Sequence, residues 1–283
     1  MTDKSRTIRY GFRVVGRAVK LYTQRKAHHW TATITLFSFL MIFPLAIFLT
    51  ALAQIIDPKA LANFLSLWMP EQAVHAIIQV LSNAKTPHWM EFIFSILVGI
   101  WGLSHILHSI IEISDEFYEY HKRHFWHRRI LAILTLGVLL TWQFITMIAY
   151  SVITWVGRWV LTSGLFPGPR YLVHLIHWST MLVLLLLQWV SLMVIYAMAG
   201  PNFKFREYMP GALFAAVLGW LANRLLIYYI RIAPVQDFYG ALTNFFVFLV
   251  WVYWESTIFI IGIGVNRVVS HDRFTRSQRV IPV

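Results

Sequence analysis

Six stretches of the chain are apolar over most of their length, and short clusters of charged residues separate them. A helix needs about 20 residues to cross a hydrocarbon core about 30 Å thick. The pattern therefore predicts an all-α transmembrane bundle with spans at about 31–56, 91–113, 130–157, 171–199, 208–231 and 238–265. Arg224 interrupts the fifth span and Glu255 the sixth, yet both spans are too apolar for helices on a soluble surface.

Lysine and arginine are distributed unevenly between the two sides that six spans define. Eighteen of them lie in the N-terminal segment, the second and fourth connections and the C-terminal tail, and five lie on the opposite side. Cytoplasmic loops are enriched in these residues, so we expect both termini in the cytoplasm. Residues 1–283 are accordingly predicted to form one transmembrane domain, with 266–283 as a cytoplasmic tail.

The N-terminal segment, residues 1–27, has the pattern of an amphipathic helix. Apolar residues recur at helical spacing, and a second face carries Arg9, Arg13, Arg17 and Lys20. Such a helix lies in the membrane interface and binds anionic headgroups of the inner leaflet. A second interpretation, that these charges only set the topology, stays open. On the outer side, residues 58–87 contain short amphipathic stretches that form either a cap or a packed loop.

Composition and charge agree with this class. Hydrophobic residues make up 58% of the chain and charged residues 13%, against about 25% charged in soluble domains. Since there is no cysteine, disulfides, thiolate catalysis and cysteine-ligated metals are excluded. The net charge of +12 lies where the topology requires it. We therefore expect membrane lipids, and no nucleic acid, as partners.

Several short motifs carry a family resemblance. They are Pro201-Asn202, Met-Pro-Gly-Ala-Leu at 209–213, Phe-Tyr-Gly-Ala-Leu at 238–242 and Trp-Val-Tyr-Trp at 251–254, with Phe-Pro-Leu at 43–45, Ile-Trp-Gly-Leu-Ser at 100–104 and Phe-Trp-His-Arg-Arg at 125–129. Over residues 25 to 270 the chain resembles the YihY/BrkB family of bacterial inner-membrane proteins, formerly labelled ribonuclease BN. The resemblance implies a six-helix inner-membrane protein, and transport or envelope-lipid roles have been suggested for members. The glutamate of the family's Gly-Ala-Glu is absent here, because the run is Gly262-Ile263-Gly264.

Polar residues in the sixth span form a stripe. An ionisable side chain in a span costs about 2.5–3.5 kcal/mol on insertion scales, so Glu255 is a candidate functional residue. Asn244, Glu255 and Asn266 share one helical face because they are eleven residues apart, and Trp251 lies near it. The stripe is predicted either to line a cavity or gate, or to form a hydrogen-bonded seam between helices. Tyr239 is a further cavity candidate.

Arg224 is the second charged candidate. Its guanidinium group suits an anionic or phosphate-bearing substrate, whereas the alternative is that it snorkels to the outer interface. Tyr228 shares its face and is also a cavity candidate. A direct pair with Glu255 would have to bridge about 9 Å of depth at the helical rise. We therefore expect a water-bridged connection between the two residues.

In the second span, His105, His108 and Glu112 share one face at spacings of three and four residues. Three interpretations stay open: a proton relay that pairs His105 with Glu255, a metal site, or histidines satisfied within the core. Two histidines and one glutamate on one helix are a weak metal signal, so no metal or cofactor is expected. His121, His124 and His127 are expected in a solvated loop beside Asp115, Glu116 and Glu119.

Small residues and prolines in the spans indicate packing or hinges. Gly211, Ala215 and Gly219 form a stripe that allows close approach of another helix. Pro44 is expected to bend the first span, and packing or hinge roles are also assigned to Pro210 and Gly240.

No catalytic motif is present: the chain has no phosphate-binding glycine loop with lysine, no His-Glu-x-x-His and no Gly-x-Ser-x-Gly. We expect a non-enzymatic protein that moves or binds an amphiphilic, anionic envelope molecule, such as a lipid or lipid precursor. The predicted route is a polar cavity between the second, fifth and sixth spans. The alternatives are a scaffold that presents basic cytoplasmic segments to partners and a membrane-embedded hydrolase or nuclease. Assembly into homo-oligomers is compatible with each.

Overall fold

The computed structural model describes residues 3–45, 47, 66, 74–75, 78–79, 89–120, 124–162, 169–201, 204–232 and 242–278. All regular secondary structure in these ranges is helical. The long helices are α1 (Asp3–Gln24), α2 (His28–Leu40), α6 (Trp89–Phe117), α7 (Phe125–Thr162), α8 (Pro169–Ala199), α9 (Phe205–Ile232) and α11 (Leu242–Gln278). The predicted all-α class is thus confirmed.

Five of these helices are long and apolar enough to cross a membrane: within α6, α7, α8, α9 and α11 the stretches are Phe92–Phe117, Phe125–Ile153, Met181–Ala199, Phe205–Tyr229 and Phe245–Asp272. They coincide with the second to sixth predicted spans, so the chain is a multi-pass membrane protein. In the first predicted span, 31–56, the described part consists of α2 and the helical turn at residues 42–45. The rest of that span and most of the predicted outer cap fall outside the described residues.

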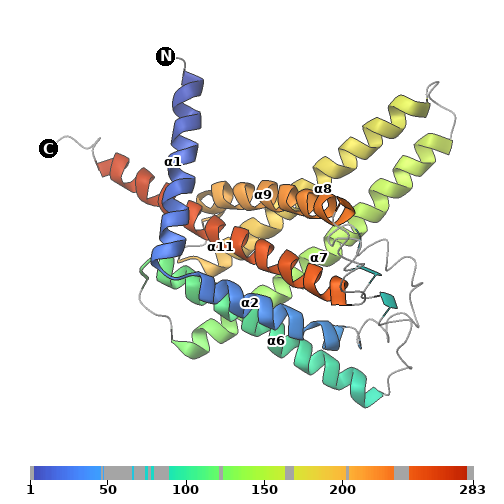
Figure 1. Ribbon diagram of the computed structural model, residues 1–283, viewed down its shortest axis with the longest axis horizontal. Coiled ribbons are helices and arrows are strands. Elements are labelled where there is room, and N and C mark those ends of the chain that lie inside the picture. Colours follow the sequence, from blue (N-terminus) through green and yellow to red (C-terminus); the bar gives the residue numbers. More distant parts are fainter. Residues whose placement is uncertain are drawn as a thin grey trace.

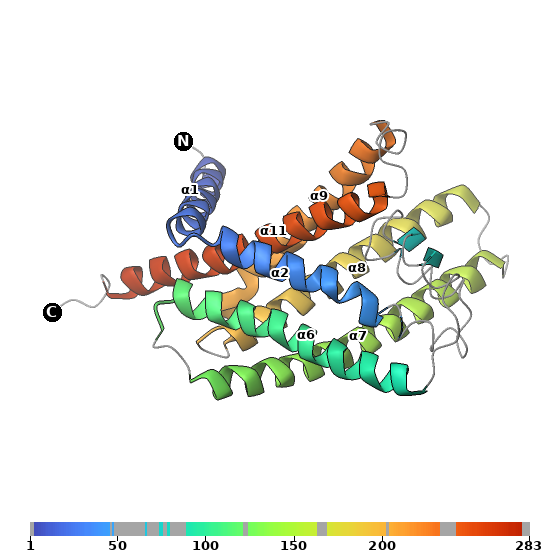
Figure 2. The same cartoon turned by 60° about the horizontal axis from the view of Figure 1, so that its bottom comes forward.

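Six helices form a closed ring. Following contacts from neighbour to neighbour, α11 packs on α9, α9 on α8, α8 on α7, α7 on α6, α6 on α2, and α2 returns to α11. Both ends of the chain lie at the same end of this bundle (Figures 1 and 2), which we call the terminal end. At the opposite end, α7 and α8 diverge from α9 and α11 (Figure 2).

The dense core lies at the terminal end of the ring. Its fully buried members come from several helices, and among them are Ile113, Phe117, Tyr196, Tyr208 and Ile260. Many large apolar side chains elsewhere on the long helices are exposed in the bundle alone, as at Leu97, Phe144 and Leu182. An exposed apolar surface of this extent matches a protein surrounded by lipid chains.

One close helix crossing explains the tight packing of α9 on α11. A Cβ atom at Gly211 would collide with the carbonyl oxygen of Gly262 and with the side chain of Asn266. The backbone N–H of Gly211 donates a hydrogen bond of 2.6 Å to Asn266 Oδ1. The small-residue stripe on α9 therefore brings two backbones together at this point.

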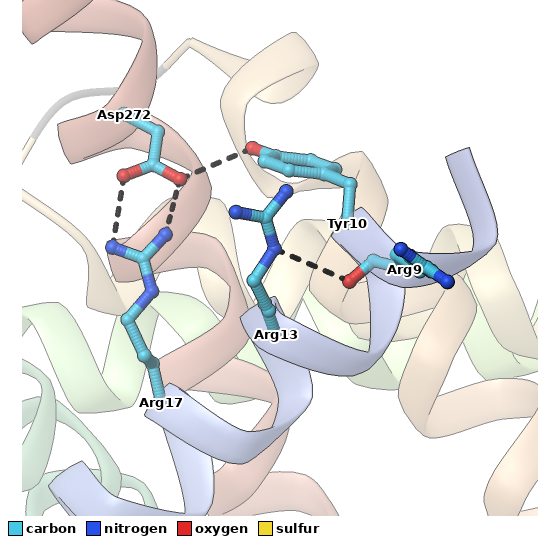
Figure 3. Close-up of polar contacts among 5 residues, drawn as sticks. All are labelled: Arg9, Tyr10, Arg13, Arg17 and Asp272. Atoms are coloured by element: carbon cyan, nitrogen blue, oxygen red, sulfur yellow. Dashed lines mark hydrogen bonds and ion pairs between the residues drawn. The ribbon is translucent and has the colours of Figure 1, made fainter. Parts of the chain in front are cut away.

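The segment after residue 265, predicted to be a tail, is helical to Gln278, so α11 extends beyond the predicted span. Its extension is held by α1, whose Val14 and Ala18 bury against Val265 and Val269. Figure 3 shows the polar part of this contact.

In that polar contact, both guanidinium Nη atoms of Arg17 bond the carboxylate of Asp272, with Nη1 3.0 Å from Oδ1. The Tyr10 hydroxyl donates to the same carboxylate. Beyond its apolar region α11 no longer packs against lipid chains. Its packing against α1 stabilises the helix there, so α11 continues.

Candidate functional site

A cavity of about 920 Å³ lies inside the helical ring. Its lining comes from α2, α6, α8, α9 and α11, and none of its lining residues belongs to α7. Most of the lining is apolar. The polar members are Ser38, Ser66, Gln188, Asn223, Arg224, Glu255 and Ser256. The cavity lies between the helices that correspond to the second, fifth and sixth predicted spans, with α2 and α8 as additional walls.

Glu255 projects from α11 toward Gly219 of α9. A Cβ atom built at Gly219 would lie 3.0 Å from Glu255 Oε2, so the absence of a side chain at Gly219 leaves room for the carboxylate. No salt bridge to Glu255 is present among the described residues. A carboxylate inside a helical bundle without a cationic partner is costly, which favours a role beyond packing.

Arg224 lines the same cavity from α9. Its guanidinium carbon lies 5.5 Å from the centroid of the Trp220 ring, and its Nη2 lies 3.7 Å from the sulfur of Met181. These are weak interactions for a guanidinium group, and within the described chain Arg224 makes no salt bridge. Two opposite charges therefore share one cavity without neutralising each other directly.

Two further polar atoms of the cavity walls lack partners. Trp251 Nε1 and Asn223 Oδ1 are buried, and neither has a hydrogen-bond partner among the described residues. Buried polar atoms in proteins are nearly always hydrogen-bonded to protein or water. The cavity is therefore suited to a guest that supplies both a donor and an acceptor.

The terminal end of the cavity is closed. Along α8, α9 and α11 the lining residues give way, toward the terminal end, to the buried core. There the hydroxyl of Tyr196 donates a 2.8 Å hydrogen bond to the carbonyl oxygen of Phe259, joining α8 to α11. The Gly211–Asn266 bond joins α9 to α11 in the same layer.

The family profile described as Virulence factor BrkB matches residues 18–280. The chain belongs to the BrkB family. The match runs from α1 to the end of the described chain and includes every residue of the cavity, and it confirms the resemblance that the motifs indicated. No individual curated protein and no solved structure matches the chain.

The structure separates the polar stripe of this BrkB-family protein into two environments. Glu255 and Trp251 line the cavity, whereas Asn266 is fully buried between α9 and α11 and does not line it. Asn266 thus takes part in a hydrogen-bonded contact between α9 and α11. The side chain of Asn244, together with Tyr239 and Gly240, falls outside the described part of the chain.

Tyr228 does not belong to the cavity. Its side chain is 66% exposed and lies on the surface of α9, although Arg224, four residues earlier, reaches the cavity. Two residues on one helical face can have different surroundings, because the face is wide. The packing of α9 in the helical ring leaves Tyr228 on the outer surface.

The two histidines of α6 lie in a different pocket. His105, His108 and Glu112 line a space of about 490 Å³ between α2, α6 and α7, and none of them lines the large cavity. The contact between His105 and Glu255 that a proton relay would require is absent, because the two residues line separate pockets. The ring centroid of His105 lies 4.1 Å from the ring centroid of Phe37 and 6.5 Å from that of His108. No group of three potential metal ligands is found among the described residues.

The predicted packing residues have mixed roles. Ala215 and Gly219 line the cavity, so in this BrkB-family chain the small-residue stripe also shapes the site. Pro210 lies inside α9, next to the crossing glycine. Pro44 is buried, and α2 ends four residues before it at Leu40. A proline ring clashes with the carbonyl group four residues earlier, which accounts for this helix end.

Sequence reasoning missed a buried charge cluster at the terminal end. Arg128 of α7 lies 3.1 Å from Glu112 and 3.4 Å from Asp115, both of α6. The Asp115 side chain is 4% exposed and that of Arg128 8%, so the expectation of a solvated loop is wrong for Asp115. The detectable signal was the i, i+3 spacing of Glu112 and Asp115, one helical turn apart.

Two more polar residues of the cavity were also missed. Gln188 of α8 and Asn223 of α9 are uncharged, so a search for ionisable groups in the spans passed over them. Each interrupts a run of apolar residues in a predicted span. A search for uncharged amide side chains within the predicted spans would have found both residues.

Proposed function

We propose that this chain is a transporter-like protein of the bacterial inner membrane that moves or binds an amphiphilic, anionic envelope molecule. A lipid or a lipid precursor has the required chemistry. The observation that carries the proposal is that Arg224 and Glu255 line one cavity of about 920 Å³ without an ion pair between them.

The character of the lining supports an amphiphile. The volume lies within the range of about 300–1,000 Å³ typical of small-molecule sites. Leucine, isoleucine and phenylalanine side chains make up most of the wall, and polar groups are few. The guanidinium group of Arg224 suits a phosphate or carboxylate, and the carboxylate of Glu255 accepts hydrogen bonds from hydroxyl or amine groups.

The proposed mechanism is alternating exposure of the cavity. Release toward the terminal end requires the layer of Tyr196, Gly211 and Asn266 to open, because its interhelical hydrogen bonds join α8 and α9 to α11. The proposed proton coupling involves Glu255 without His105, since the two residues line separate pockets. The proposed role is non-enzymatic.

The proposed topology has six spans with both termini in the cytoplasm. It is supported by the position of both chain ends at the terminal end of the bundle (Figure 1) and by the excess of lysine and arginine there. Across that end, α1 exposes Arg9, Arg13 and Lys20 on one side. We propose that this basic side contacts anionic headgroups of the inner leaflet.

The test is mass spectrometry of molecules retained by the gently purified protein, comparing the wild type with Arg224→Gln and Glu255→Gln. A hydrogen bond to a charged group contributes about 1.5–3 kcal/mol. We therefore expect about tenfold or greater depletion of a defined anionic amphiphile in each variant, at tenfold per 1.4 kcal/mol. Arg206→Gln and Glu116→Gln remove the same charges outside the cavity and should retain it. Equal amounts of bulk lipid in all five proteins would refute the proposal.

A scaffold role is the second candidate, and one observation favours it. α1 protrudes from the bundle (Figure 1), and its basic side chains and Phe12 are exposed, which suits a docking element for cytoplasmic partners. Deleting residues 1–26 separates the two functions. A scaffold would lose its activity in complementation of a deletion strain, whereas a transporter would still retain the amphiphile in the mass spectrometry test.

A further inference from the structure

The second pocket, between α2, α6 and α7, has a different chemistry from the large cavity. Its lining consists of Trp30, Thr33, Trp101, His105, His108, Ser109, Glu112, Phe125, Trp126 and Arg129, and its volume is about 490 Å³. Aromatic side chains predominate in this lining, beside the guanidinium group of Arg129, whereas aliphatic side chains predominate in the cavity. The pocket lies at the terminal end of the bundle, beside the first turns of α2 and α7 and the second half of α6.

The pocket has an uncommitted cation. Glu112 is its one carboxylate, and Glu112 is already engaged by Arg128 at 3.1 Å. Arg129, the next residue, projects into the pocket and makes no salt bridge within the described chain. Its guanidinium group is therefore available to an anion from outside the protein.

Two histidine side chains add to this chemistry. His108 is buried, and within the described part of the chain its Nδ1 atom has no hydrogen-bond partner. His105 stands one turn away on the same wall, whereas the hydroxyl groups of Ser109 and Thr33, which also line the pocket, already donate to the backbone carbonyl oxygens of His105 and His29. An unsatisfied buried nitrogen beside a free guanidinium group is a suitable arrangement for oxygen atoms of a phosphate group.

The surroundings indicate where the rest of the ligand lies. Trp101 and Trp126 line the pocket and are largely exposed on the outside of the bundle. One turn beyond Trp101 on α6 is Leu97, and one turn beyond Arg129 on α7 is Ile133, both exposed and apolar. Tryptophan is enriched at the level of lipid headgroups. The pocket thus opens onto a surface that suits acyl chains.

From this juxtaposition we propose that Arg129, His105 and His108 form a second binding site, which takes the phosphate of a phospholipid headgroup from the surrounding membrane. Trp101 and Trp126 flank the headgroup, and the acyl chains lie along Leu97 and Ile133. The site is independent of the proposed transport cavity, because the two share no lining residue.

The test is a native mass spectrometry titration of delipidated protein with short-chain phosphatidylglycerol. The background is Arg224→Gln, which removes the cavity's own cation. Adding Arg129→Gln should weaken lipid binding at least tenfold, whereas adding Arg206→Gln, the same charge change at the start of α9, should leave it unchanged. Equal affinity in the two double variants would overturn the proposal.

A second pair of variants keeps the test decisive if Arg129→Gln fails to fold. Trp126→Leu should weaken binding several-fold, while Trp155→Leu should not, although both tryptophans are exposed on α7. Inorganic phosphate and glycerol phosphate distinguish the two possible sources of the phosphate group. Displacement of the lipid by either at comparable concentration would identify a small-anion site and overturn the lipid assignment.

Discussion

Asn266 of α11 holds Gly211 of α9 by a hydrogen bond of 2.6 Å from the Gly211 backbone N–H to Asn266 Oδ1. Asn266 is fully buried. Because the glycine lacks a side chain, the two helices come close enough for a side-chain amide to reach a backbone amide. This contact lies in the layer that closes the terminal end of the cavity, so its strength bears on both stability and opening.

Asn266→Ala should destabilise the protein. The substitution leaves the Gly211 N–H buried without that acceptor and creates a small void, at a cost of about 1–3 kcal/mol. Thermal unfolding in detergent, followed by tryptophan fluorescence, measures the loss. Asn223→Ala is the matched control, because Asn223 Oδ1 has no hydrogen-bond partner in the described ranges. An equal fall in melting temperature for both variants would contradict the special role of Asn266.

Gly211→Ala should also destabilise the protein, by overpacking. The added Cβ would collide with the Gly262 carbonyl oxygen and with Asn266, and such insertions cost about 1–3 kcal/mol. Gly137→Ala on α7 is the control, since a Cβ there meets nothing within 4 Å. Alanine is the better helix former, so that control should be neutral or slightly stabilising. The same unfolding measurement compares them, and a neutral Gly211→Ala would exclude the close crossing.

Gly219→Ala should impair the site more than the fold. Its Cβ would lie 3.0 Å from Glu255 Oε2, and the flexible carboxylate can move away. We expect a small change in melting temperature but several-fold lower retention of the amphiphile. Gly99→Ala on α6, where a Cβ meets nothing within 4 Å, should change neither quantity. Unaltered retention in Gly219→Ala would show that the position of the carboxylate is unimportant.

Arg128→Gln should be among the most damaging substitutions at the terminal end. It would leave Asp115, which is 4% exposed, without the cation that lies 3.4 Å away. Removing one partner of a buried ion pair costs about 3–5 kcal/mol. The neighbouring Arg129→Gln removes the same charge without breaking a salt bridge and should cost under about 1 kcal/mol. Melting temperatures of the two variants check this contrast, and similar values would contradict the buried cluster.

The attachment of α1 to α11 should depend more on apolar packing than on the ion pair between Arg17 and Asp272. The Arg17 side chain is 51% exposed, and exposed pairs contribute about 0–1 kcal/mol. Arg17→Gln should therefore leave α1 attached. Val14→Asp would place a charge against Val265 and Val269 and should release it. Limited proteolysis after Arg25 and Lys26 reports release, and faster cleavage in Arg17→Gln than in Val14→Asp would reverse this ranking.

The pattern of apolar runs was sufficient to locate the membrane helices. A span needs about 20 apolar residues, and the segments now seen as α6, α7, α8, α9 and α11 satisfy that requirement without reference to any neighbour. The same solvation cost singled out Arg224 and Glu255, since a charge within an apolar run is conspicuous in the sequence. Both line the cavity.

Periodicity could not decide what each face of a helix contacts. Glu255 and Asn266 lie on one stripe of α11, yet one lines the cavity and the other is sealed against Gly211. One interpretation of the sequence paired His105 with Glu255 in a proton relay, but the ring places them in separate pockets. Spacing gives the position of a side chain around and along its own helix, whereas its partner depends on the order of helices in the ring.

The chain alone determined that this protein crosses the membrane repeatedly and carries two unusual charges in its last two spans. Those features follow from local free energies of transfer, which depend on each segment by itself. Only the tertiary structure decided that the two charges share a cavity without pairing, that Arg128 and Asp115 are buried together, and that Arg129 makes no salt bridge within the described residues. Such features depend on contacts between segments far apart in sequence, and close packing selects these contacts only when the helices assemble.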